Sequence, residues 1–334
     1  MAIHISEQVP LTEYTTMRVG GKARYFALVK NIDEIRQAVD FANERKLNVL
    51  ILGGGSNMII SDDGFDGLVI KMEILGIDID HNILKVGAGE VWDDVVSGAV
   101  TRGLWGIENL SLIPGSVGGA VVQNIGAYGV EAKEIIFSVD AFDIDTMQVK
   151  TFLNSECEFG YRESIFKKNK NLIVTSVTFE LKENGIPKID YEDVKKYFSD
   201  KKIITPSLDE IREAIVSIRG AKMPAPPIGT AGSFFKNPVI SVSQYNTLKT
   251  MYPDIKAYSQ GDNDMKLSAA WLIDHIGGFR GVRRKDAGVH EKQALILVNY
   301  GNANAEEIFL LAKEIKDDIN KKINVSLEEE VVVV

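Results

Sequence analysis

Cysteine is almost absent from this sequence, since Cys157 is the only one among 334 residues. A single thiol cannot form an internal disulfide, nor can it build a Cys-rich zinc site. The four histidines show no metal-ligand pairing either, so the sequence predicts no metal. Cys157 is expected to be inert packing, because no neighbour that would lower its pKa is visible.

Long apolar runs and large basic clusters are missing as well. No stretch approaches the roughly 20 apolar residues of a bilayer-spanning helix, and the opening MAIHISE has neither region of a secretory signal. There are 38 basic against 47 acidic residues, a net charge of −9, and the longest basic cluster, residues 167–170, is interpreted as a solvated turn. We therefore expect a cytoplasmic protein that binds no membrane and no nucleic acid.

What is present indicates a globular α+β protein. The length suits about two domains of the usual size, and prolines in residues 223–227 mark a plausible boundary. Asn31 with Glu34, and Ser207 with Glu210, have the spacing of helix capping boxes. Apolar periodicity predicts helices at residues 31–47, 91–102, from 207, from 241 or 243, 268–276 and 305–322, and strands at 49–52, 67–71, 83–88, 175–181, 233–235, 294–298 and 325–334.

Glycine supplies the most informative motifs. A short glycine-rich run directly follows the apolar strand at 49–52 and could cradle an anion with backbone N–H groups, although an ordinary tight turn explains it equally well. No dinucleotide fingerprint or P-loop is present, because Met58 stands three residues past Gly55 and no Gly-Lys-Ser/Thr follows. Residues 114–129 form a second glycine-rich segment. Two such loops in one chain favour a large cofactor with a pyrophosphate and a broad ring system over a purely structural crossover.

Other candidate side chains are weak signals by themselves. Ser233 lacks a Gly-x-Ser-x-Gly elbow and a recognisable base, so it is more simply a hydrogen-bonding residue at a strand end than a nucleophile. Arg162 and Lys222 could hold an anionic substrate but are ordinary surface residue types. The acidic run at residues 328–330 would usually be a solvated turn before an edge strand.

Nine short motifs follow one another along the chain: TTMRVGG (15–21), LGGGSN (52–57), IPGSVGGA (113–120), QNIGAYG (123–129), YRES (161–164), GSFFKNP (232–238), GGFRG (277–281), HEKQA (290–294) and LEEEV (327–331). In this order they resemble the UDP-N-acetylenolpyruvoylglucosamine reductase family, flavoenzymes that make UDP-N-acetylmuramate for peptidoglycan. The similarity spans nearly the whole chain and includes a tyrosine-bearing segment, residues 189–193, that is typical of the longer form of the family.

The resemblance implies a fold and a domain organisation. The fold class would be α+β, with a two-lobe FAD-binding domain of the vanillyl-alcohol-oxidase type and a C-terminal α+β substrate-binding domain. Residues 1–70 would form the first FAD-binding lobe, to which a C-terminal strand, 323–334, returns. Residues 71–221 would form the second lobe and residues 222–322 the substrate-binding domain.

It also implies an activity and a set of site residues. FAD, held non-covalently, would take hydride from NADPH and pass it from N5 to C3 of UDP-N-acetylglucosamine enolpyruvate, with ping-pong kinetics. Ser233 would donate the proton to C2, and Arg162 and Glu330 would stabilise the enolate-like intermediate. Substrate contacts would be Tyr161, Tyr191, Lys222, Asn237 and Gln293. Cofactor contacts would be Gly53, Gly54, Gly55, Ser56, Asn57, Pro114, Gly115, Ser116, Gly118, Gly119, Gln123, Asn124, Ile125, Gly126, Ala127, Tyr128 and Gly129.

The chain departs from the family pattern near its C-terminus. Family members usually have Pro between the two glutamates and Arg two places after the second, whereas this chain has Glu329 and Val332. Leu327 and Val331 favour Glu330 as the functional glutamate, and a monomer is expected. Two rival hypotheses stay open at this point: an oxidase of small alcohols or sugars on the same fold, and a nucleotide-sugar binding module without catalysis.

Overall fold

The computed structural model describes residues 3–334, which divide into two compact units. Unit 1 comprises residues 1–9, 23–54 and 66–221, of which residues 1 and 2 lie outside the described part. Unit 2 comprises residues 10–22, 55–65 and 222–334. No helix within residues 3–334 is long and apolar enough to cross a membrane.

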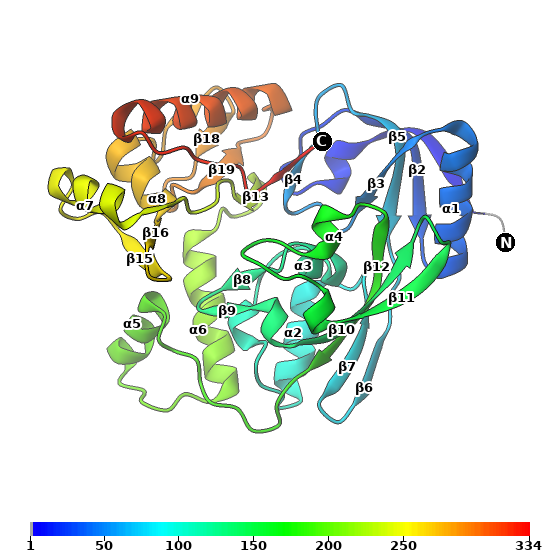
Figure 1. Ribbon diagram of the computed structural model, residues 1–334, viewed down its shortest axis with the longest axis horizontal. Coiled ribbons are helices and arrows are strands. Elements are labelled where there is room, and N and C mark those ends of the chain that lie inside the picture. The colour runs from blue at the N-terminus through cyan, green and yellow to red at the C-terminus, as the bar shows by residue number, and fades with distance from the viewer. Residues whose placement is uncertain (1–2) are drawn as a thin grey trace. The chain divides into compact units, whose positions relative to one another are not determined.

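Within the described residues, unit 1 contains two larger sheets, one two-stranded sheet and six α-helices, whose arrangement Figure 1 shows. One sheet has the order β1 (Ile5–Pro10), β2 (Lys22–Val29), β5 (Phe65–Met72), β3 (Asn48–Leu52), and the other has the order β11 (Gln148–Leu153), β10 (Ile136–Asp143), β12 (Leu172–Glu180), β7 (Ile83–Gly87), β6 (Ile77–Asp80). A short hairpin joins β8 (Gly126–Ala127) and β9 (Val130–Glu131). The helices are α1 (Ile32–Arg45), α2 (Trp92–Thr101), α3 (Val117–Val122), α4 (Ile165–Lys168), α5 (Glu192–Lys201) and α6 (Leu208–Lys222).

The predicted helix caps explain where two of these helices begin. Asn31 accepts from the amide of Glu34 at 3.0 Å, while the Glu34 carboxylate accepts from Lys30, one residue before the position a capping box requires. Ser207 and Glu210 form the complete reciprocal box, at 3.3 Å and 2.8 Å. Both helices then bury an apolar stripe that includes Ile35 and Ile211.

Unit 2 has one principal sheet, covered by a long helix. The sheet order is β13 (Gly229–Ser233), β19 (Ile296–Asn299), β18 (Ala287–Val289), β17 (Arg283–Arg284), and Figure 1 shows α9 (Ala305–Ile323) alongside β18 and β19. A smaller sheet has the order β14 (Val239–Ser241), β16 (Asp264–Leu267), β15 (Ala257–Gln260), next to α7 (Val242–Met251). Asn304 and Asp62 accept from the first amides of α9, between 2.8 and 3.0 Å.

Three sequence expectations need correction. The predicted C-terminal strand at 325–334 is reduced to β20 (Val332–Val333), parallel to β4 (Met58–Ile59), because residues 328–330 pair with residues 234–236 instead. The predicted helix at 268–276 is α8 (Ala269–Trp271) continued by a π-helical turn, Leu272–Gly277. The basic cluster at 167–170 begins in α4, which Ser164 caps, rather than in a turn.

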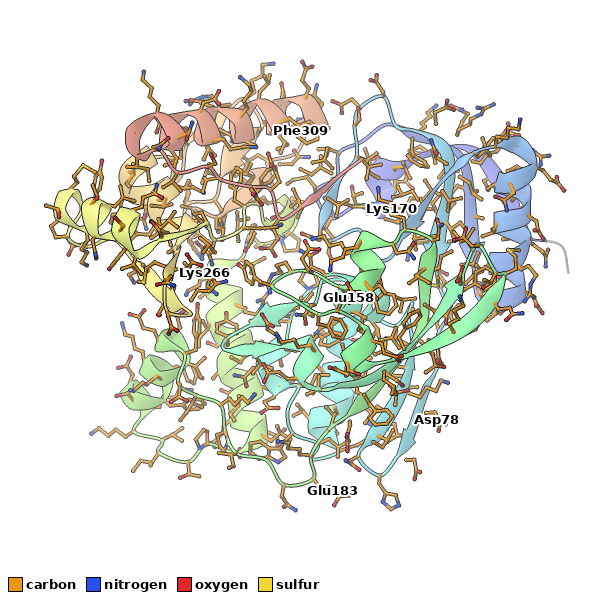
Figure 2. All side chains as sticks on the ribbon, viewed as in Figure 1. Asp78, Glu158, Lys170, Glu183, Lys266 and Phe309 are labelled. Carbon is orange, nitrogen blue, oxygen red and sulfur yellow. The ribbon has the colours of Figure 1, made fainter. Side chains whose placement is uncertain are left out.

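Charged side chains project outward, as Figure 2 shows for Asp78 and Glu183, both of which are exposed. The one cysteine lies inside. Cys157 is fully buried, its thiol donates to the carbonyl of Leu153 at 3.3 Å, and burial raises its pKa from 9.0 to about 12. These observations confirm the expectation that Cys157 is packing.

Candidate functional site

The two glycine-rich segments touch each other within unit 1. A methyl group on Gly53 would collide with Ser116 Oγ, and one on Gly54 would lie 2.6 Å from Gly115 Cα. Glycine is therefore required here by the close approach of two backbones. The Gly54 amide donates to no acceptor among residues 3–334, so it is free to bind an anion.

The segment after Gly115 carries an unsatisfied polar group. Ser116 caps α3, because its hydroxyl accepts a hydrogen bond from Gly119 N at 3.4 Å. Gly118 packs closely against Ala88, since a methyl group on Gly118 would lie 3.0 Å from Ala88 Cβ. Gln123 follows α3, is 7% exposed, and its Nε2 has no partner among the described residues. A buried amide without an acceptor costs about 1–3 kcal/mol. A bound polar cofactor that supplied the acceptor would remove this cost, so the segment fits FAD.

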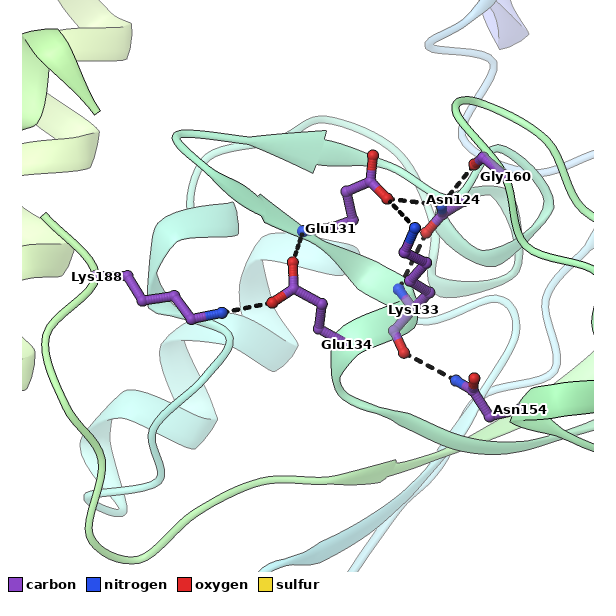
Figure 3. A network of polar contacts seen from close by, with 7 residues as sticks. All are labelled: Asn124, Glu131, Lys133, Glu134, Asn154, Gly160 and Lys188. Carbon is purple, nitrogen blue, oxygen red and sulfur yellow. Dashed lines mark hydrogen bonds and ion pairs between the residues drawn. The ribbon is translucent and has the colours of Figure 1, made fainter. Parts of the chain in front are cut away.

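Asn124 is held by the protein itself. Its Nδ2 donates to Gly160 O at 2.8 Å and to Glu131 Oε2 at 3.3 Å, and its Oδ1 accepts from Lys133 N at 3.0 Å (Figure 3). Its φ of 41° lies in the left-handed region, which asparagine tolerates better than most residues. The side chain of Asn124 therefore links the predicted cofactor segment to residues 131, 133 and 160.

Arg162 and Gly126 form a matched pair. Arg162 Nη2 donates to the carbonyl of Gly126 at 3.0 Å, and a methyl group on Gly126 would lie 3.0 Å from Nη1. The Arg162 guanidinium also lies 5.1 Å from the ring centroid of Tyr161. The backbone of Arg162 has φ of 58°, an uncommon conformation for a residue other than glycine and one that clusters at functional sites.

In unit 1, Tyr191 packs against Tyr128, and Tyr128 interacts with Arg219, a residue for which the sequence analysis predicted no role. The rings of Tyr191 and Tyr128 pack edge to face, with centroids 5.3 Å apart. Tyr128 interacts electrostatically with Arg219; burial raises the pKa of Tyr128 and lowers that of Arg219. Arg219 lies on α6 three residues before Lys222, so both side chains lie on one face of the helix. This spacing from a predicted substrate contact is the sequence feature that indicates Arg219.

Ser233 occupies a β-bulge in unit 2. Between the pairs Thr230–Val298 and Ser233–Ile296, β13 advances three residues while β19 advances two. Gly232 permits this with φ of 76°. Bulges redirect side chains beside active sites, and the Ser233 hydroxyl makes no hydrogen bond to any of residues 3–334. It is therefore available to a ligand.

The C-terminal segment lies next to this serine. The amide of Glu330 donates to the carbonyl of Phe234 at 2.8 Å. Asn57, predicted as a cofactor contact, donates through Nδ2 to the carbonyl of Glu330 at 3.3 Å and accepts from Val332 N at 2.9 Å. The structure thus brings Glu330 to the residue that follows Ser233, and it gives Asn57 a structural role that the sequence motif did not indicate.

The remaining predicted contacts are distributed over both units. The Asn237 Oδ1 accepts a hydrogen bond from Ala269 N at 2.9 Å. The carbonyl of Gln293 accepts a hydrogen bond from the amide of Ile296, and Ile296 is the strand partner of Ser233. Tyr161 and Tyr191 belong to unit 1, and Lys222 ends α6. In unit 2, Ser233, Glu330 and Gln293 therefore lie on backbone segments that are hydrogen-bonded to their neighbours, and in unit 1 Arg162 lies beside Tyr161.

Comparisons with known proteins cover almost the whole chain. A family model described as an FAD binding domain matches residues 23–151, and one described as the C-terminal domain of UDP-N-acetylenolpyruvoylglucosamine reductase matches residues 224–334. Proteins of the latter name from Pseudomonas putida and Flavobacterium johnsoniae are 41% and 40% identical; the alignments cover 99% of this chain and 99% and 100% of theirs.

A solved structure agrees with these sequence comparisons. The UDP-N-acetylenolpyruvylglucosamine reductase of Thermus caldophilus superimposes with a TM-score of 0.70 at 27% identity, over 99% of this chain and 98% of that one. The predicted α+β fold class, with an FAD-binding domain and a C-terminal domain, is confirmed, and so is the expectation of an FAD-dependent oxidoreductase with NADPH as reductant. The chain belongs to the UDP-N-acetylenolpyruvoylglucosamine reductase family.

Proposed function

We propose that this protein reduces UDP-N-acetylglucosamine enolpyruvate to UDP-N-acetylmuramate with NADPH, as a step of peptidoglycan precursor synthesis. Full-length similarity to reductases of that name supports the substrate. The observation that carries the chemistry is the Ser233 hydroxyl, which lies on a β-bulge next to the segment that bears Glu330 and has no hydrogen-bond partner among residues 3–334.

FAD would be the hydride carrier. When bound, FAD would supply the transfer of a hydride from NADPH to C3 of the enolpyruvyl group, from flavin N5. The Gly54 amide and the buried Gln123 amide are the groups of unit 1 best placed to hold it, together with the other predicted contacts of residues 53–57 and 114–129. NADPH and the sugar nucleotide would use one site in turn, which gives ping-pong kinetics.

Ser233 would supply the proton that completes the reduction. Hydride addition at C3 leaves an electron pair on C2, conjugated with the carboxylate, and the Ser233 proton goes to C2. The methylene carbon becomes a methyl group, NADPH becomes NADP⁺, and a proton from water restores the Ser233 hydroxyl, so charge and atoms balance. An acid of this kind needs no histidine to deprotonate it first, which removes the objection that excluded a serine nucleophile.

Arg162 and Glu330 would stabilise the charge that develops on the substrate. The Arg162 guanidinium is pre-oriented by the Gly126 carbonyl, so little reorganisation is needed when negative charge appears. Glu330 is pre-oriented through its main chain, because its amide donates a hydrogen bond to the Phe234 carbonyl and its carbonyl accepts one from Asn57 Nδ2. Tyr161, Tyr191, Lys222, Asn237 and Gln293 would bind substrate or NADPH.

The same proposal includes the wider organisation of the protein. Residues 1–70 with the returning strand 323–334 would form one FAD-binding lobe, residues 71–221 the second, and residues 222–322 the substrate-binding domain. The protein would act as a monomer in the cytoplasm.

Purified protein tests the proposal directly. It should be yellow, and NADPH oxidation should depend on added UDP-N-acetylglucosamine enolpyruvate. A colourless preparation that FAD cannot reconstitute would favour a binding module. NADPH-independent flavin reduction by an alcohol or sugar, followed by rapid reoxidation in oxygen, would identify an oxidase.

A further inference from the structure

The run Glu328-Glu329-Glu330 presents three carboxylates in succession, and only one of them can stand where the proposed reaction needs it. The segment is held to residues 234–236 by two main-chain hydrogen bonds, Lys236 N to Glu328 O and Glu330 N to Phe234 O, both 2.8 Å. In an extended segment a displacement by one residue exchanges the two faces. Such a displacement here would replace one carboxylate by another.

The first two carboxylates of the run are held very differently. Glu328 is 77% exposed and lies 3.8 Å from Lys236 Nζ, a pair that solvent screens. Glu329 receives Lys316 Nζ on both oxygens, at 2.8 Å and 3.1 Å, and the side chains of Lys316 and Glu329 are only 35% and 32% exposed. Partial burial reduces screening, so this pair is the stronger restraint on the segment.

Lys316 is itself firmly placed. It lies on α9, where the preceding residue, Ile315, and the residue one helical turn further on, Ile319, are both fully buried in the core of unit 2. The ion pair therefore ties residue 329 to a packed helix rather than to a mobile loop. Phe235 and Glu329 pair across the bridge, so the Glu329 side chain takes the face of Phe235 and leaves the adjacent residue, Glu330, to the other face.

We propose that Lys316 is a positioning residue for the reaction: by binding Glu329, it fixes the register and orientation of Glu330 beside Ser233. The proposal rests on the proposed function, which assigns Glu330 its role. Lys316 touches neither substrate nor cofactor in this account, and it acts through Glu329. The ion pair also keeps the Glu329 charge neutralised next to Glu330.

Rapid-mixing measurements on the intact flavoprotein separate the two half-reactions. In Lys316→Met, oxidation of reduced flavin by UDP-N-acetylglucosamine enolpyruvate should slow about tenfold, with the substrate concentration for half-maximal rate changed less than about twofold. Flavin reduction by NADPH should stay within about twofold of the parent. The matched control is Lys313→Met on the same helix, since Lys313 pairs with Asp317 on an exposed surface; both half-reactions should be unchanged.

A charge swap tests whether the pair itself matters. Lys316→Glu and Glu329→Lys should each slow substrate reduction by more than tenfold, while the double variant should recover to within about threefold of the parent. Lys316→Arg, which keeps the pair, should also remain within about threefold, and it covers the case in which Lys316→Met folds poorly. Parent-like substrate reduction in Lys316→Met, or a double variant no better than the single ones, would overturn the proposal.

Glu330→Gln distinguishes this proposal from the function on which it rests. If Glu330→Gln slows substrate reduction but Lys316→Met does not, only the role of Lys316 is refuted. If Glu330→Gln leaves substrate reduction unchanged, the assignment of Glu330 in the proposed function is wrong, and the role of Lys316 is refuted with it.

Discussion

Ser233→Ala should abolish most activity without a loss of stability. The Ser233 hydroxyl makes no hydrogen bond to residues 3–334, so its removal breaks no hydrogen bond among them. We expect the free energy of unfolding to stay within about 0.5 kcal/mol of the parent. Loss of a general acid typically costs about 10²–10⁴ in rate, and that loss should fall on substrate reduction alone.

Ser241→Ala, also in unit 2, should lower stability but leave activity unchanged, the reverse of what is expected for Ser233→Ala. Ser241 caps α7 and its hydroxyl accepts from Gln244 N at 3.2 Å. Loss of such a cap costs about 1 kcal/mol, which should lower the thermal midpoint by about 2–4 °C. Activity at room temperature should be unchanged, because Ser241 has no place in the proposed chemistry.

Two assays on both variants decide the matter. Rapid mixing with NADPH and then with substrate measures the half-reactions, and thermal unfolding followed by circular dichroism measures stability. The assignment of Ser233 fails if Ser233→Ala slows flavin reduction as much as it slows substrate reduction. It also fails if the thermal midpoint falls by as much as in Ser241→Ala, since the serine would then have a structural role.

Three further predictions concern cofactor retention, acid stability and thiol reactivity. Gly54→Ala should purify with a lower ratio of flavin to protein absorbance, because its methyl group would meet Gly115 Cα at 2.6 Å; parent-like flavin content would contradict the packing. Burial alone would raise the pKa of Asp93, but hydrogen bonds from Arg212 lower it overall. That carboxylate therefore stabilises the fold above its ordinary pKa of 3.8, and the contribution disappears as pH falls below it; Asp93→Asn should flatten this acid limb in unfolding curves. Native Cys157 should resist iodoacetamide at pH 8, as mass spectrometry can show, because burial raises its pKa to about 12.

Local signals predicted much of the fold correctly. The caps at Asn31 and Ser207 and the apolar stripes behind them depend only on residues a few places apart, and the helices begin where these residues stand. The ordered glycine and serine motifs were sufficient to indicate the family. Gly54 and Gly126 were noticed as ligand-binding glycines, although the structure gives each a steric reason as well.

Long-range pairing explains what the sequence could not reveal. The bulge at Ser233 arises from its register with Ile296, and the shortened C-terminal strand arises because Glu330 bonds to Phe234, about a hundred residues earlier. No local pattern encodes such partners. Arg219 was missed for a related reason: a single arginine on a helix acquires meaning only when Tyr128 is placed beside it.

In the proposed reaction, reduced flavin on this protein gives its hydride to an enolpyruvyl sugar nucleotide. The most direct measurement is the visible flavin absorbance of the purified protein without oxygen. NADPH should bleach it, and subsequent UDP-N-acetylglucosamine enolpyruvate should restore it with formation of one equivalent of UDP-N-acetylmuramate. Absorbance that stays bleached until oxygen is admitted would contradict the account.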